Sequence, residues 1–188
     1  MYLLDIEPLD LGADVRSVGL ELVGADENRE PVRGADAARI WSRVLQATAG
    51  QEAWALDFFS HVDRVRDFCK LHDIAYREAN QRSIVVPAPE PAALESLLER
   101  FEAETFGARA GALVAPGAPA DLVLEGELAR RGVDAYRAAY ANYFFCAVCA
   151  FEDGSLVLLS ERLSAGEVIR RVRPVLQGLS VALPLDPQ

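Results

Sequence analysis

Residues 143–163 read YFFCAVCAFEDGSLVLLSERL, and this stretch determines more of the fold than any other of its length. Two apolar runs, rich in aromatic and branched side chains, flank Asp153 and Gly154. Asp-Gly between such runs is typical of a two-residue hairpin turn, because a type I′ turn needs positive φ at both central residues. The predicted register then pairs Cys149 with Leu158. Since both faces of both strands are apolar, we expect the hairpin to lie deep inside a sheet that is covered on two sides, or on one side with a partner on the other.

On either side of this hairpin, strand and helix patterns alternate along the chain. The predicted elements are strands over 2–9 and 15–23, a helix over 35–48, a strand over 54–59, a helix beginning at 60, strands over 74–79 and 83–87, a helix over 91–106, strands over 110–115 and 122–129, a helix over 133–140, the hairpin, a helix over 164–176 and a strand over 178–185.

From about residue 51 onward the order βαββαβ occurs twice, which is the ferredoxin-like order. The Pro- and Gly-rich segment 115–120 separates the two occurrences. The sequence therefore predicts an α+β protein with tandem ferredoxin-like units: an N-terminal β-β-α extension over 1–50, a first unit over 51–116, and a second unit over 117–188 that contains the central hairpin. In the alternative interpretation, 51–72 is one continuous helix and the chain is one larger α+β domain.

The net charge of −10 at pH 7 is unevenly distributed. Residues 1–30 carry eight acidic side chains against Arg16 and Arg29, whereas the helix over 164–176 is rich in arginine. An acidic and a basic end permit contacts between copies, and we expect a homodimer. The strand patterns of residues 1–30 are the weakest in the chain, so we expect this segment to contribute more to association than to core stability.

The acidic balance argues against nucleic acid and against an anionic membrane surface as partners. The longest apolar run, around 136–151, is interrupted by Arg137 and Asn142 and is too short to span a bilayer. The first residues show no secretory signal pattern, and three cysteines cannot form a complete disulfide framework. These features predict a cytoplasmic protein.

Cysteine and histidine offer two candidate sites, and both are better explained by packing. Cys146 and Cys149 form a C-x-x-C, but inside a strand their odd separation directs the side chains to opposite faces. Cys69 and His72 share a helix face, with Asp73 as a third candidate for a metal ligand or for orienting a Cys–His nucleophile. Neither set is complete, so we expect no metal and no other cofactor, and we assign no catalytic residue.

An acidic and aromatic neighbourhood precedes the hairpin. Glu125 and Glu127 lie close in sequence to Tyr136 and Tyr140, whose rings are positioned to line a cleft between helix and sheet. We take these four as the candidate ligand-binding residues.

Three functions remain open. The preferred hypothesis is a regulatory, protein-interaction or ligand-binding module without catalytic activity, whose partner is a protein or a small ligand. One alternative is an enzyme with acid/base groups drawn from Glu125, Glu127, His61 or His72 at the junction of the units. Another is an acidic, partner-blocking protein of the inhibitor or immunity type, which docks residues 1–30 on a basic surface. A pocket with a hydrogen-bonded histidine and carboxylate favours the enzyme, a flat apolar sheet face favours the module, and a continuous acidic surface favours the blocker.

Overall fold

The computed structural model describes residues 1–10, 16–50, 54–58, 62–80, 83–87, 89–101, 108–113, 143–150, 154–160 and 162–184. All structural statements below concern these residues. The predicted strand over 122–129 and the predicted helix over 133–140 lie outside them.

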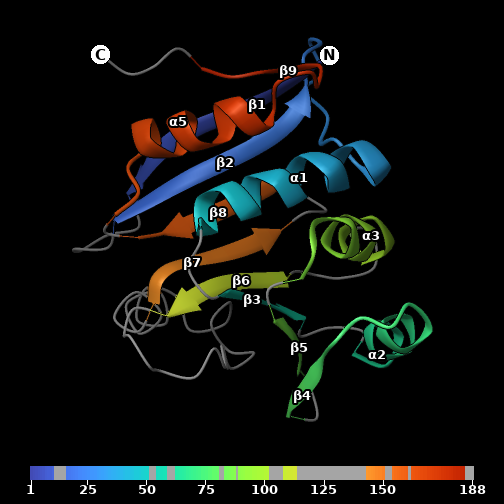
Figure 1. Cartoon of the computed structure of the whole chain (residues 1–188). Helices are drawn as coiled ribbons and strands as arrows, with labels where there is room; N and C mark the ends of the chain where they lie inside the picture. The colour runs from blue at the N-terminus through green and yellow to red at the C-terminus, as the bar shows by residue number, and fades with distance from the viewer. Residues whose placement is uncertain are drawn as a thin grey trace.

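One mixed sheet runs through the described part of the chain (Figure 1). Its strands are β1 (Tyr2–Asp10), β2 (Arg16–Gly24), β3 (Trp54–Phe58), β4 (Arg77–Asn80), β5 (Ser83–Pro87), β6 (Ala108–Leu113), β7 (Tyr143–Ala150), β8 (Ser155–Leu159) and β9 (Val181–Ala182). The spatial order is β4-β5-β3-β6-β7-β8-β2-β1-β9. Every neighbouring pair is antiparallel except β1 and β9, which are parallel.

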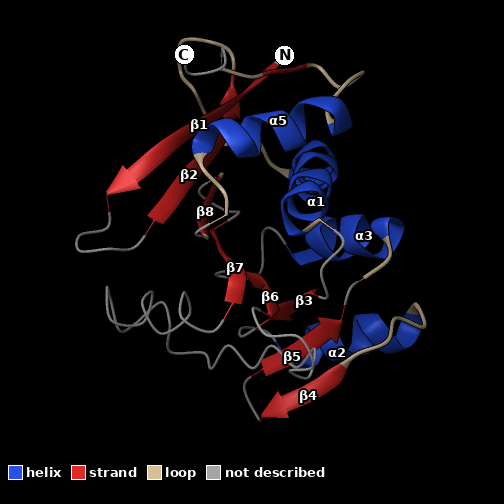
Figure 2. Ribbon diagram, turned by 60° about the vertical axis from the view of Figure 1, so that its left-hand side comes forward, coloured by secondary structure: helices blue, strands red, loops and turns tan. Residues whose placement is uncertain are grey.

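The described helices lie on one face of this sheet, as Figures 1 and 2 show together. They are α1 (Gly34–Ala49), α2 (Val62–Leu71), α3 (Pro91–Phe101) and α5 (Ala165–Val175). The class is therefore mixed α+β, as predicted. Because β3 precedes α2 as a separate strand, the alternative of one continuous helix over 51–72 is wrong. None of the described helices combines the length and the apolar character that a membrane crossing requires.

The main core fills the space between the helices and the sheet. Alternation along β2 places Val18, Leu20 and Leu22 on the helix side, where all three are buried. Helical spacing places an apolar stripe of α1 against them. The largest fully buried side chains are Trp41, Phe58, Leu4, Leu20, Leu22, Leu45, Leu56 and Ile84.

The N-terminal strands belong to this core, which corrects the expectation that residues 1–30 act mainly in association. β2 lies between β8 and β1, and Leu4 and Leu22 are completely buried. The weak sequence pattern arises because Asp5, Glu7 and Glu21, on the helix-free side, alternate with the buried apolar residues of these strands.

The tandem repeat is not confirmed. In 54–113, β5 lies between β3 and β4, and β3 lies between β5 and β6, which is the split arrangement expected for βαββαβ. In the second half, β8 has β7 on one side and β2 on the other. The N-terminal segment thus fills the place beside β8 that a strand over 122–129 would need in a second such unit. The division of the chain at residues 50 and 116 stays a prediction.

The hairpin lies inside the sheet as predicted, because β7 and β8 each have a neighbour on both sides. Its register differs from the prediction by two residues: Cys149 pairs with Leu156, and Ala150 pairs with Ser155. The connection therefore spans 151–154 instead of two residues. A shift by two leaves every residue on its predicted face, because side chains alternate with period two.

The first turn of α5 follows its sequence signature in part. Ser164 Oγ accepts a hydrogen bond from the backbone N–H of Glu167 at 3.2 Å, as a capping serine should. The Glu167 carboxylate does not complete the box, because it pairs with Arg170 and Arg171 along the helix instead.

Candidate functional site

The ligand-binding residues predicted from the sequence, Glu125, Glu127, Tyr136 and Tyr140, lie outside the described residues, as does His61. Their role stays a prediction.

The Cys69–His72 pair does not form a reactive site. Cys69 is fully buried on the core side of α2, and burial raises the pKa of its thiol to about 11, so it stays protonated near neutral pH. His72 is exposed beyond the helix end, where its ring packs on Phe68 with the centroids 4.2 Å apart. Within the described ranges, no three side chains of His, Cys, Asp or Glu are grouped to hold a metal ion.

Both cysteines of the C-x-x-C lie in β7, as predicted. Cys146 stands opposite Gly111 and Leu159, and Cys149 stands opposite Ala108 and Leu156.

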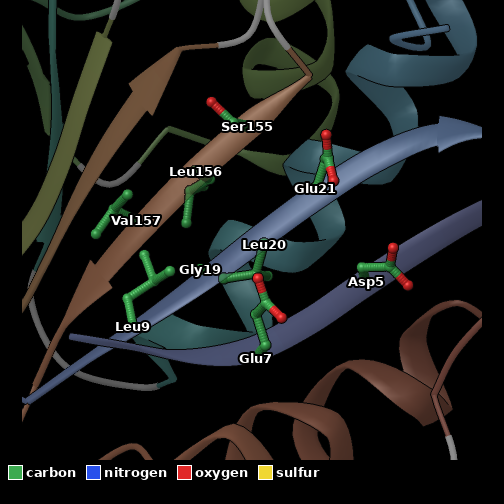
Figure 3. Close-up of a pocket in the computed structure, with 9 residues that line it drawn as sticks. All are labelled: Asp5, Glu7, Leu9, Gly19, Leu20, Glu21, Ser155, Leu156 and Val157. Atoms are coloured by element: carbon green, nitrogen blue, oxygen red, sulfur yellow. The ribbon is translucent and has the colours of Figure 1, made fainter. Parts of the chain in front are cut away.

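The helix-free side of β1 and β2 instead carries a cluster of carboxylates. Asp5 stands directly opposite Glu21 in the β1–β2 ladder, and Glu7 follows two residues along β1 on the same face. Figure 3 shows the three side chains on one side of the two strands. The Asp5 and Glu21 side chains are 36% and 56% exposed, so they remain in contact with water.

A shallow hollow of about 240 Å³ lies among these carboxylates and extends onto β8 (Figure 3). Gly19 lies within it, and a Cβ on Gly19 would stand 2.9 Å from the Leu9 side chain. The absence of a side chain at residue 19 thus lets Leu9 lie across the strand. The described residues that line the hollow are Asp5, Glu7, Leu9, Gly19, Leu20, Glu21, Ser155, Leu156 and Val157.

Arg29 connects the two opposed carboxylates. Its guanidinium pairs with Asp5 and lies 3.8 Å from Glu21, and the hydrogen bond to Asp5 is the main reason why the pKa of Arg29 is raised. Residue 29 has φ 50, and its backbone N–H donates to Asp26 Oδ1 at 3.2 Å. The loop after β2 thus holds one positive charge against the edge of the acidic cluster.

Further acidic residues lie at the end of β1 and in the loop after β2. Asp10 at the end of β1 and Asp26, Glu27 and Glu30 in the loop after β2 are all exposed. We call the surface formed by Asp5, Glu7 and Glu21 the acidic face. Its strands carry the arginine-rich helix α5 on their opposite side (Figure 1).

Comparison with known proteins gives no match, whether with protein-family models, with curated proteins or with solved structures. The role of the acidic face therefore has to be argued from its own geometry.

Sequence reasoning found the acidic segment but not the arrangement of its charges. Alternation placed Ser17, Gly19 and Glu21 together on the polar side of the second strand. The missing information was the register with β1, which brings Asp5 opposite Glu21.

Proposed function

We propose that this protein is an interaction module that binds a basic protein surface through the acidic face. The observation that carries the proposal is the pair Asp5–Glu21, two carboxylates directly opposite each other in a sheet. Like charges in this position destabilise the sheet. Arg29 pairs with Asp5 and lies 3.8 Å from Glu21, yet both carboxylates stay in contact with water, so the cationic groups of a partner can bind beside them. The net charge of −10 would also speed the approach of a basic partner.

This proposal combines the preferred hypothesis, an interaction module, with the acidic surface expected of a partner-blocking protein. The helices cover the other side of β1 and β2, so the acidic face is directed away from them (Figures 2 and 3). The mixture of carboxylates with Leu9 and Val157 gives the hollow both charge and apolar area, which suits basic side chains with long aliphatic stems.

The described residues support the enzyme hypothesis less than they support an interaction module. His72 and Glu99 line one cleft, but no hydrogen bond joins these two side chains. The hydrogen-bonded pair of histidine and carboxylate that would favour an enzyme is therefore not formed by these two residues.

The test measures binding of the full chain to a synthetic peptide of alternating arginine and valine, by fluorescence anisotropy at several salt concentrations. The face variant combines Asp5→Asn, Glu7→Gln and Glu21→Gln. The control combines Asp67→Asn, Asp73→Asn and Glu90→Gln, three exposed acidic residues on α2, after it and before α3. Both variants lose the same formal charge.

We expect the face variant to bind the peptide about tenfold or more weakly than the parent at low salt, and the control to stay within about twofold. Salt should weaken binding by the parent, because exposed charges are screened. Equal losses in the two variants would show that the peptide senses net charge alone, and the acidic face would then have no special role. Circular dichroism confirms that each variant is folded.

We further propose that residues 54–113 form a single ferredoxin-like unit, supported by the order β4-β5-β3-β6 and by the antiparallel pairing throughout. The homodimer also remains a proposal, which sedimentation of the full chain would test.

A further inference from the structure

A second hollow lies on the helix side of the molecule, between α2 and α3. It measures about 440 Å³, and its described lining residues are Phe68, His72, Ser96, Glu99 and Arg100. This volume falls within the range of small-molecule sites in proteins. The cleft shares no described residue with the acidic face.

The wall formed by the end of α2 is aromatic and apolar. The rings of Phe68 and His72 pack together at 4.2 Å between centroids, with 38° between their planes. Leu71 lies between them in sequence and is 80% exposed. Among the large apolar side chains that the structure describes, Met1 and Leu71 are the exposed ones. This end of α2 therefore presents apolar area that a ligand can cover.

The wall formed by α3 is polar and carries both charges. Ser96, Glu99 and Arg100 are spaced i, i+3 and i+4, so they share one side of the helix, while Leu94, Leu97 and Leu98 are buried. A carboxylate and a guanidinium thus line the same cleft as the aromatic pair at the end of α2.

We propose that this cleft binds an aromatic α-amino acid. Its ring would lie against Phe68 and His72, its ammonium group would pair with Glu99, and its carboxylate would pair with Arg100. An α-amino acid carries an ammonium group and a carboxylate on one carbon atom, and the cleft offers an opposite charge to each of them. An uncharged ring would use only the aromatic wall, and an aromatic acid or amine would use only one of the two charges.

The test is isothermal titration of the full chain with L-tryptophan, with indole-3-propionate, which lacks the ammonium group, and with tryptamine, which lacks the carboxylate. We expect L-tryptophan to bind about fivefold or more tightly than either analogue. Arg100→Gln should lower the affinity for L-tryptophan to that of the parent for tryptamine. Glu99→Gln should lower it to that of the parent for indole-3-propionate. Lys70→Gln and Asp67→Asn, charge changes on α2 outside the lining, should leave all three affinities unchanged.

Absence of binding by L-tryptophan at millimolar concentration would overturn the proposal. So would equal affinities for the three compounds, or equal losses in the cleft variants and in the α2 variants. Because the arginine–valine peptide is measured separately, failure of this site leaves the interaction proposal standing, and the reverse also holds.

Discussion

Gly154, directly before β8, occupies a position where both conformation and space require glycine. Its φ is 67, and a Cβ there would lie 2.7 Å from the carbonyl oxygen of Leu22. Its own carbonyl accepts a hydrogen bond from the Leu22 N–H at 2.7 Å. This contact ties the hairpin connection to β2, directly beside the β2–β8 ladder.

Gly154→Ala should therefore reduce the free energy of unfolding more than Gly178→Ala does. Gly178 also has positive φ, 83, but a Cβ there would meet no atom within 4 Å. The conformational penalty, of order 1–3 kcal/mol, is common to both variants, while the contact with β2 adds a steric penalty at residue 154 alone. Urea unfolding of the two variants measures the difference. Equal losses would show that the backbone of β2 moves aside without penalty.

Cys69 gives a pH dependence whose sign follows from its burial. Its pKa is raised from about 9 in the unfolded chain to about 11 in the folded protein. Below pH 9 both states hold the proton; between pH 9 and 11 the unfolded state releases it first, so stability falls by about 1.4 kcal/mol per pH unit. Above pH 11 this contribution changes no further.

The measurement compares urea unfolding of the parent and of Cys69→Ala from pH 8 to 11. Removal of buried atoms lowers the stability of the variant at every pH, but its curve should fall less steeply than that of the parent above pH 9. Parallel curves would show that the thiol ionises at its ordinary pKa in the folded protein.

At the scale of elements, β2 is the strand through which the N-terminal segment joins the rest of the sheet. Leu20 is 2% exposed and faces Ile6 on one side and Leu156 on the other. Leu20→Ala should reduce the free energy of unfolding by about 2–5 kcal/mol. Leu71→Ala, at a position that is 80% exposed, should change it by less than about 0.5 kcal/mol.

Deletion of residues 1–30 should abolish cooperative unfolding for the same reason, because it exposes one whole edge of β8. A truncated chain that still unfolds cooperatively would show that β1 and β2 are an appendage, and would restore the expectation drawn from the sequence.

Local patterns predicted most of the elements, because alternation and helical spacing are properties of short segments. The helix α1, expected over 35–48, and the strand β5, expected over 83–87, occur where the pattern placed them. Pairing between distant segments could not be read this way. The placement of β2 beside β8 depends on apolar partners from opposite ends of the chain, and two hairpin registers that differ by two residues bury the same faces.

The same limit applies to the candidate sites. Composition revealed the acidic segment, but the opposition of Asp5 and Glu21 depends on the β1–β2 register. His72 was recognised as a candidate group, but with Cys69 as its partner. The structure places Cys69 in the core and His72 in the cleft with residues of α3, which no spacing rule connects to α2.

At the scale of the whole molecule, the sheet separates two surfaces of different chemistry. The helices and the main core lie on one side, while the acidic face lies on the other side at the β1–β2 end (Figures 1 and 3). A partner bound to the acidic face, as we propose, would not contact the core. The carboxylates of the acidic face should then lower the free energy of unfolding, because they repel each other, while they strengthen binding of a basic partner.

The variant Glu21→Gln tests whether stability and binding change in opposite directions. The substitution removes one of two directly opposed carboxylates and leaves the pairing of Arg29 with Asp5 in place, so the free energy of unfolding should rise at low salt. Added salt should reduce this gain in the free energy of unfolding, because salt screens the repulsion between exposed charges. Glu27→Gln removes an exposed carboxylate of the following loop and serves as the control for net charge. Urea unfolding at low and high salt measures both variants against the parent.

The same Glu21→Gln variant should bind the arginine–valine peptide more weakly than the parent. A gain in stability together with a loss of binding is expected where charges are retained for a partner, because exposed carboxylates that repel each other in the free protein also attract the cationic groups of that partner. A loss of stability would instead show that Glu21 acts mainly as a second partner for Arg29. The acidic face would then be a structural ion pair, and its binding role would fall with it.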